Sequence, residues 1–306
     1  MRELGDKWYG YGSGVIASVD ESHADVVHTY VSDATVRGED DPMLFKCATR
    51  VGDLLYATTE TEVLVYRLPD FELLHHVSHP WFNDVHHVLP TPGGDLLVAS
   101  SGIEAALEID LDGELLRQYP VDDERQGFWS DDRDLRFGVN LKPHAIHPNH
   151  LFMIGDEPWA TRFELRDAVS LTDRGRRIAI DRQRVHDGHV HDGQVWFTTV
   201  DGAVVIGDPD TGAVVDTYDL NEHRQNVIPG WCRGLLIHDD HFWVGFSRIR
   251  QTAVRARLGW IRTGLSTSLP TRIERWDRAT RRMDACIDLE PLEINAVFSI
   301  LEGTTT

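Results

Sequence analysis

The chain of 306 residues has few cysteines, no long apolar segment and few lysines, and each shortage excludes a class of protein. Its three cysteines, Cys47, Cys232 and Cys286, are too few and too widely spaced for a disulfide framework or a paired-cysteine zinc motif. No apolar run approaches the ~20 residues that a membrane-spanning helix needs, and the first residues lack the apolar core of a secretion signal. We therefore expect a cytoplasmic protein without a membrane partner.

Positive charge is scarce as well. The 50 acidic residues outnumber the 30 Lys and Arg residues, which gives a formal net charge of −20, and only three of the basic residues are lysines. Such a surface repels nucleic-acid phosphates, so we expect no nucleic-acid partner. An acidic, lysine-poor surface suits a high-salt environment, but high-GC coding also depletes lysine, and composition leaves both explanations open.

Motifs for nucleophilic and nucleotide chemistry are also missing. The chain has no GxSxG nucleophile elbow, no P-loop and no GxGxxG turn that opens a helix. It also has no HExxH zinc motif. A serine-type hydrolase, a nucleotide-binding fold and a zincin protease are therefore not expected.

The chain does contain a repeat of short apolar strands separated by tight turns. Each unit of about 40 residues has four strands, which is typical of a β-propeller. The second strands of five units have similar apolar cores, and these cores lie at 54–59, 96–101, 151–155, 195–199 and 242–246. No long amphipathic helix interrupts them. The repeat predicts an all-β propeller that occupies the whole chain, 1–306, as a single domain.

The predicted ring has six blades. Five are expected at about 44–78, 85–121, 141–182, 185–220 and 232–289. The remaining strand, 294–300, has no partners after it, whereas 14–19 and 25–31 lack an inner strand. Pairing these ends makes a sixth blade and closes the ring, which removes exposed sheet edges. Two insertions, about 122–140 and 247–270, are expected on the face where the inner strands enter the channel, and long loops of this kind are often functional.

Several segments resemble a conserved family of predicted bacterial propellers with PGFxRGL, VGLSxxR and DxHD motifs. The matching segments are PGWCRGL at 229–235, VGFSRIR at 244–250, NDVHH at 83–87, His186 with HDGQVW at 191–196, and EINAV at 293–297. The likeness covers about residues 80 to 300. It departs at 140–143, where NLKP replaces HLNG, within the expected site. The resemblance implies a propeller but no established activity. Gluconolactonase-type and arylsulfotransferase-type propellers are more distantly similar.

Aligning the repeats on their second strands places one residue of each blade at the start of the inner strand, pointing toward the axis. These residues are Lys46, His86, Lys142, His186, Arg233 and Asn295. Clustered cations repel one another and persist most easily where an anion is bound. We therefore expect a small anionic ligand at the channel mouth. Arg248 and Arg250, at the mouth end of a strand, extend the expected anion site.

If the site is catalytic, His86 or His186 is the expected general acid or base. Lys46, Lys142 and Arg233 would then stabilise negative charge that develops on the substrate. The sequence does not decide whether the protein is an enzyme.

Three other interpretations stay open. The axial residues could only line a water-filled channel. Alternatively, His86, His144 and His186 could bind a divalent metal cofactor in a hydrolase or lyase. Because side chains alternate along a strand, we expect only one histidine per blade to reach the axis. Finally, the propeller could be a non-catalytic scaffold that binds a protein partner on its rim.

Overall fold

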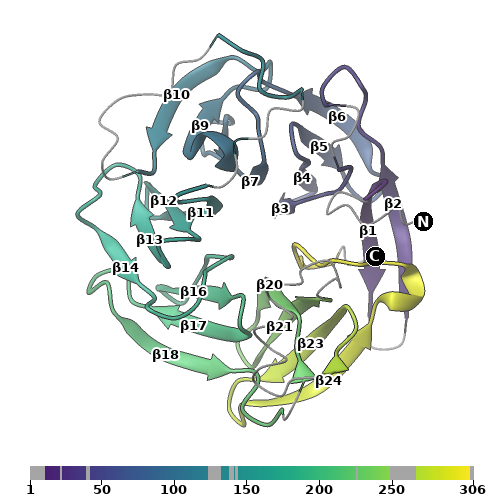
Figure 1. Ribbon diagram of the computed structural model, residues 1–306, viewed down its shortest axis with the longest axis vertical. Helices are drawn as coiled ribbons and strands as arrows, with labels where there is room; N and C mark the ends of the chain where they lie inside the picture. The colour runs from purple at the N-terminus through teal and green to yellow at the C-terminus, as the bar shows by residue number, and fades with distance from the viewer. Residues whose placement is uncertain are drawn as a thin grey trace.

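Small antiparallel sheets are arranged in a ring around a central axis in the computed structural model (Figure 1). The structure describes residues 11–20, 23–38, 42–122, 132–137, 141, 144–224, 227–248 and 267–303. Within these ranges the helical elements are two single 3₁₀ turns, η1 (Ser101–Ile103) and η2 (Glu290–Leu292). The prediction of an all-β propeller is confirmed.

Five of the sheets have four strands each, and we number them as blades one to five. Blade one contains β3 (Cys47–Val51), β4 (Leu54–Thr58), β5 (Val63–Arg67) and β6 (Glu72–Val77). Blade two contains β7 (Val85–Pro90), β8 (Leu96–Ser100), β9 (Ala105–Ile109) and β10 (Leu115–Pro120). Blade three contains β11 (Pro148–Ile154), β12 (Glu157–Arg162), β13 (Asp167–Ser170) and β14 (Arg177–Ala179).

Blade four contains β15 (His189–His191), β16 (Gln194–Thr199), β17 (Ala203–Gly207) and β18 (Val214–Asp219). Blade five contains β20 (Trp231–Ile237), β21 (His241–Ser247), β23 (Arg272–Asp277) and β24 (Arg282–Asp288). Strands pair in chain order, with the first strand of a blade toward the axis and the fourth at the rim (Figure 1). These five blades fall where the repeat predicted them.

Turn residues and buried aromatics explain why the chain folds into these units. In blade four, Asp208 accepts backbone hydrogen bonds that close the turn after β17, and Gly212 adopts φ +71°. A side chain at Gly212 would lie 2.4 Å from the carbonyl oxygen of Arg177, so this turn requires glycine. Between blades four and five, the rings of Trp196 and Phe242 pack with centroids 6.0 Å apart. Burying a phenylalanine of this kind contributes about 1.5–3 kcal/mol.

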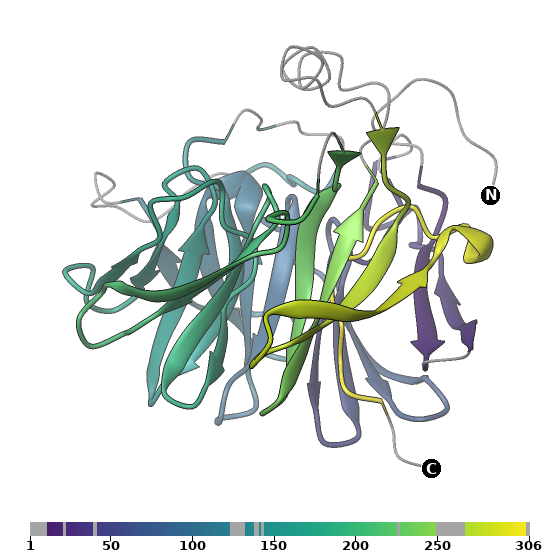
Figure 2. The same ribbon diagram turned by 90° about the horizontal axis from the view of Figure 1, so that it is seen from below.

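The predicted sixth blade is not a hydrogen-bonded sheet. Strands β1 (Gly14–Val19) and β2 (Ala24–Tyr30) pair only with each other, and residues 294–300 form no strand. Both chain ends do lie in the sixth sector of the ring (Figure 1). The C-terminal segment descends from η2 through the thickness of the ring (Figure 2). The described ranges therefore form five four-stranded blades, and the prediction of six is wrong.

The physical reason lies in the partners of the C-terminal segment. Both backbone groups of Val297 bond to the Ser247 hydroxyl, its N–H at 3.0 Å and its carbonyl at 3.2 Å. The Ala48 N–H likewise donates to the Ser299 hydroxyl at 3.1 Å. Side chains therefore satisfy backbone groups that a strand ladder would use. A groove of about 560 Å³ in this sector is lined by β1 and residues 296–303 among others.

A further parallel pair joins β19 (Val227–Ile228) to β22 (Thr267–Ser268). Most of the two predicted insertions, namely 123–131, 138–140 and 249–266, lies outside the described residues, and their expected place at the channel mouth stays a prediction. In the part of the chain that the structure describes, no helix has the length and apolar character to cross a membrane.

Candidate metal site at the channel axis

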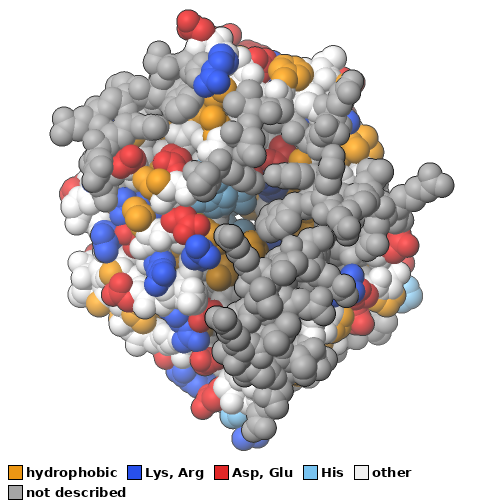
Figure 3. Space-filling view, viewed as in Figure 1, with side chains coloured by type: hydrophobic (Ala, Val, Ile, Leu, Met, Phe, Trp, Pro, Cys, Tyr) orange, Lys and Arg blue, Asp and Glu red, His pale blue; other side chains and the backbone are white. Residues whose placement is uncertain are grey.

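Histidines from blades two, three and four meet around the axis in two layers. In the first layer, ring centroids are 4.8 Å apart for His144 and His147, 4.6 Å for His147 and His86, and 6.1 Å for His86 and His186. Figure 3 shows histidine side chains beside the central opening of one face.

The second layer lies further along the same inner strands. Ring centroids are 3.7 Å apart for His87 and His150, and 4.7 Å apart for His150 and His189. Each of the three blades therefore contributes to both layers, and the axis carries more histidines than one per blade.

The prediction that one histidine per blade reaches the axis is wrong because the inner strands are irregular. In β7, Val85 pairs with Ser100 and His87 pairs with Ala99, so His86 is an extra residue without a partner on β8. The ladder of β11 shifts in the same way between Pro148 and Leu151. A bulge interrupts the alternation of side chains between the two faces of a strand and changes the direction in which they point. Successive histidines can therefore both face the channel.

Asp84 organises the first layer. One carboxylate oxygen accepts a hydrogen bond from the ammonium group of Lys46, and the other lies 2.9 Å from Nε2 of His144. Nε2 of His86 lies 3.5 Å from the first oxygen. Lys46 also pairs with Glu60 at 2.7 Å. Burial opposes ionisation, but Lys46 and the two imidazoles hold the pKa of Asp84 well below its usual value.

Three first-layer histidines each have one ring nitrogen toward a carboxylate and one buried nitrogen without a hydrogen bond. Nε2 of His86 and of His144 face Asp84, and Nδ1 of His186 lies 3.5 Å from Asp187. The opposite nitrogens have no partner among the described residues. A carboxylate that takes the N–H of an imidazole leaves the other nitrogen with a free lone pair, as is usual for metal-binding histidines.

Burial keeps several of these imidazoles neutral. It is the main reason why the pKa of His86 falls to about 3, with Lys46 adding to the effect. The pKa of His87 also falls to about 3, and burial lowers the pKa values of His147, His150 and His189. Neutral imidazole is the form that binds metal ions.

The backbone is strained at two residues of the first layer. Asp84 has φ +53° and His147 has φ +57°, a conformation that few non-glycine residues adopt. Ligand atoms of Asp84, His86 and His147 lie within 4.8 Å of one another. Strain of this kind costs of order 1–3 kcal/mol and concentrates at functional sites.

Arg233 is the second axial cation that the structure describes. It is buried, its Nε lies 3.3 Å from the hydroxyl of Ser247, and its guanidinium lies 3.6 Å from the ring centre of Phe298. Burial lowers the pKa of Arg233 to about 10. No carboxylate of the described chain forms an ion pair with it, although Asp187 stabilises its charge from nearby. The guanidinium is therefore available to an anionic group.

The other predicted ligand residues lie elsewhere or outside the described residues. Arg248 is exposed and pairs with Glu290 at 3.2 Å. The backbone carbonyl of Asn295 accepts a hydrogen bond from Thr271, and the Arg248 N–H donates to the same threonine. The described contacts thus place Asn295 and Arg248 together near η2, without contact to the histidine layers. Lys142 and Arg250 lie outside the described residues.

Several residues of the axis were not among the predicted site residues. They are Asp84, His147, Asp187 and Phe298, and the second-layer histidines His87, His150 and His189. Asp84 lies two residues before His86 in the sequence, and Asp187 directly follows His186. Both carboxylates were therefore visible as acidic neighbours of predicted site residues. Together with Glu60, these carboxylates outnumber Lys46 and Arg233, so the described axis is not the cationic ring that the sequence predicted.

Comparisons with known proteins support the fold. No family model and no curated protein matches the chain. A Bacteroides caccae protein of unknown function is 13% identical, with a TM-score of 0.61 and coverage of 94% of each chain. A streptogramin B lyase is 12% identical over 92% of this chain and 78% of its own, with a TM-score of 0.51. The WD40 domain of Neurospora crassa Pan2 is 8% identical, over 79% and 65% respectively, with the same TM-score. At this identity the likenesses show the propeller fold alone.

Proposed function

We propose that the first histidine layer binds a divalent metal ion in a hydrolase or lyase. Asp84, His86 and His147, whose ligand atoms lie within 4.8 Å of one another, are the proposed ligands, and Nε2 of His144 supports Asp84 at 2.9 Å. The observation that carries the proposal is this convergence of ligand atoms, together with the buried Nδ1 of His86, which has no hydrogen-bond partner among the described residues. Imidazole ligands suit Zn²⁺ and other first-row ions. A bound ion of this kind acts as a Lewis acid and lowers the pKa of its water to about 7.

The remaining first-layer groups are proposed to act on the substrate. Nδ1 of His186 faces Asp187, whose other oxygen accepts a hydrogen bond from the Gly234 N–H at 2.8 Å. This arrangement orients the imidazole and leaves its Nε2 free to accept a proton, as a general base requires. Arg233 would bind an anionic group of the substrate, since no described carboxylate neutralises it. The low pKa of His86 suits a ligand better than an acid or base.

The proposal is tested by zinc titration of protein that has been stripped with a chelator. His86→Ala removes a proposed ligand and should weaken zinc binding by about tenfold or more. Loss of even a residue that only supports a metal ligand lowers metal affinity by about 10–100-fold. His75→Ala is the matched control, since His75 is exposed on the outer strand β6. Equal zinc affinity in both variants and the wild type would refute the metal site.

A second candidate is the binding of a small anion without a metal, and the free guanidinium of Arg233 favours it. Thermal shift with phosphate, sulfate and carboxylates separates the two. An anion response that persists in His86→Ala but disappears in Arg233→Met, with no zinc response in any variant, would favour this second function. Binding of a protein partner on the rim stays a prediction.

A further inference from the structure

A second group of metal-ligand side chains lies beyond the first layer. Ligand atoms of His150, Asp187 and His189 lie within 4.8 Å of one another. Nδ1 of His150 is 3.9 Å from Oδ1 of Asp187, and the two imidazole rings have centroids 4.7 Å apart. The group draws on β11, on the segment before β15 and on the first residue of β15, so it joins two neighbouring blades.

The carboxylate of this group is held in place. Oδ2 of Asp187 accepts hydrogen bonds from the hydroxyl of Thr198 and from the N–H of Gly234, the latter at 2.8 Å. Oδ1 faces His186 at 3.5 Å and His150 at 3.9 Å. Asp187 is almost fully buried. An oriented carboxylate with one oxygen directed at two imidazoles is the arrangement of a ligand supported by outer partners.

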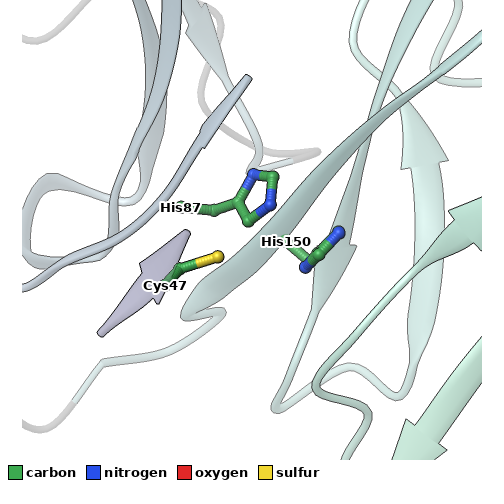
Figure 4. Close-up of side chains that lie close together, drawn as sticks. All are labelled: Cys47, His87 and His150. Atoms are coloured by element: carbon green, nitrogen blue, oxygen red, sulfur yellow. The ribbon is translucent and has the colours of Figure 1, made fainter. Parts of the chain in front are cut away.

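The neighbouring trio of Cys47, His87 and His150 is a weaker candidate. Figure 4 shows these side chains pointing toward one another from β3, β7 and β11. However, Nδ1 of His87 accepts the N–H of Leu151 at 3.3 Å, and its Nε2 lies 3.4 Å from the hydroxyl of Thr49. That hydroxyl donates to a backbone carbonyl, so it accepts from Nε2. Both nitrogens of His87 are therefore engaged.

By contrast, no side-chain hydrogen bond of the described structure occupies the ring nitrogens of His189, and those of His150 meet only Asp187 at 3.9 Å. We propose that His150, Asp187 and His189 bind a second divalent first-row metal ion, separate from the ion of the first layer. Two imidazoles and one carboxylate with open positions suit Fe²⁺ or Zn²⁺. The ligands differ from those of the proposed catalytic metal, although Asp187 also orients His186.

The test measures zinc stoichiometry by equilibrium dialysis of chelator-stripped protein, with elemental analysis of the protein chamber. The wild type should bind two zinc ions per chain. His189→Gln and His150→Gln should each bind one, and His147→Gln should also bind one. The double variant His147→Gln with His189→Gln should bind none. Circular dichroism and thermal unfolding of each variant establish that it is folded.

Cys47→Ser distinguishes the proposed site from its neighbour. It should keep two zinc ions, because the proposed ligands exclude the thiol. Loss of one ion in folded Cys47→Ser, or two ions in folded His189→Gln, would overturn the second site. If the wild type binds a single ion, its loss in His189→Gln but not in His147→Gln supports the second site and refutes the proposed function. The reverse pattern refutes the second site and leaves the proposed function standing.

Discussion

At the scale of single residues, the axis depends on a buried cation between two carboxylates. Lys46 is 5% exposed, and its ammonium group contacts Asp84 and Glu60. Burial disfavours its charge, but the two carboxylates raise the pKa of Lys46 above its ordinary value. Isolated buried charges are costly, so each group here depends on the others. The same carboxylate that neutralises Lys46 also orients two imidazoles.

Lys46→Met should therefore destabilise the protein strongly. The methionine fills a similar volume, but the buried carboxylate of Asp84 and the partly buried carboxylate of Glu60 lose the charge of Lys46. Breaking a buried pair in this way costs about 3–5 kcal/mol. The measurement is the free energy of unfolding from urea titrations of the wild type and the variant.

The control is Arg67→Met, which removes an ion pair with Glu72 on the surface. Both side chains of that pair are more than half exposed, so its loss should cost about 1 kcal/mol or less. If Lys46→Met costs no more than Arg67→Met, the buried ion pair does not stabilise the axis.

At the scale of elements, irregular strand starts decide which side chains meet. The bulge at His86 and the register shift after Pro148 bring consecutive histidines to the axis. Sequence periodicity predicts regular strands and therefore finds only one residue per blade. The left-handed backbone at Asp84 and His147 is equally invisible to a repeat alignment, because neither residue is glycine. The observed site therefore differs from the predicted one because of local backbone geometry, which tertiary packing determines.

A buried carboxylate, Glu62, adds a polar contact between the β1–β2 ribbon and blade one. Glu62 accepts hydrogen bonds from Tyr30 at 2.7 Å, from Ser32, and from Thr59 at 2.8 Å. Its other neighbour is Nε2 of His76 on β6, at 2.9 Å. Burial favours the neutral acid, but these hydrogen bonds, led by that of His76, lower the pKa of Glu62. The polar contact between the ribbon and blade one therefore uses an ionised Glu62.

This attachment should make stability depend on pH through His76. The hydrogen bond to Glu62 raises the pKa of His76 above 6.5, despite partial burial. A raised pKa in the folded state contributes stability below pH 6.5 that is lost as the pH rises through the raised value. The difference in unfolding free energy between the wild type and His76→Gln should thus shrink as the pH rises from below 6.5 through the raised pKa of His76.

His75→Gln serves as the control, because its side chain is exposed on the same strand. Its difference from the wild type should stay flat over the same range. A flat difference for His76→Gln as well would show that the raised pKa of His76 does not support the ribbon.

At the scale of the whole molecule, the sequence predicts the parts of the fold that repeat. Five blades follow from a period of about 40 residues, because each contains its own four strands and turns. The sixth sector instead depends on contacts between residues 14–30 and 294–300, which are nearly the full chain apart. No local pattern specifies that the hydroxyls of Ser247 and Ser299 bond there in place of a strand.

The residues of the site also fall into those that the repeat predicts and those that it does not. Lys46, His86, His186 and Arg233 were found from their place at the start of inner strands, and the structure places all four at the axis. Their partners Asp84 and Asp187 were not found, because alignment of repeats identifies equivalent positions and not the side chains that face them across the channel. The carboxylates that balance Lys46 were not found for that reason, since they come from neighbouring segments.

The most direct test of the account is the position of a bound metal in crystals of the protein soaked with Zn²⁺. Anomalous difference density recorded at the zinc absorption edge reports the ion itself, independent of any assay. The account predicts a peak at the axis within bonding distance, about 2.0–2.1 Å, of Nδ1 of His86 and of a ring nitrogen of His147. Crystals that bind zinc only at surface histidines, with no axial peak, would contradict it.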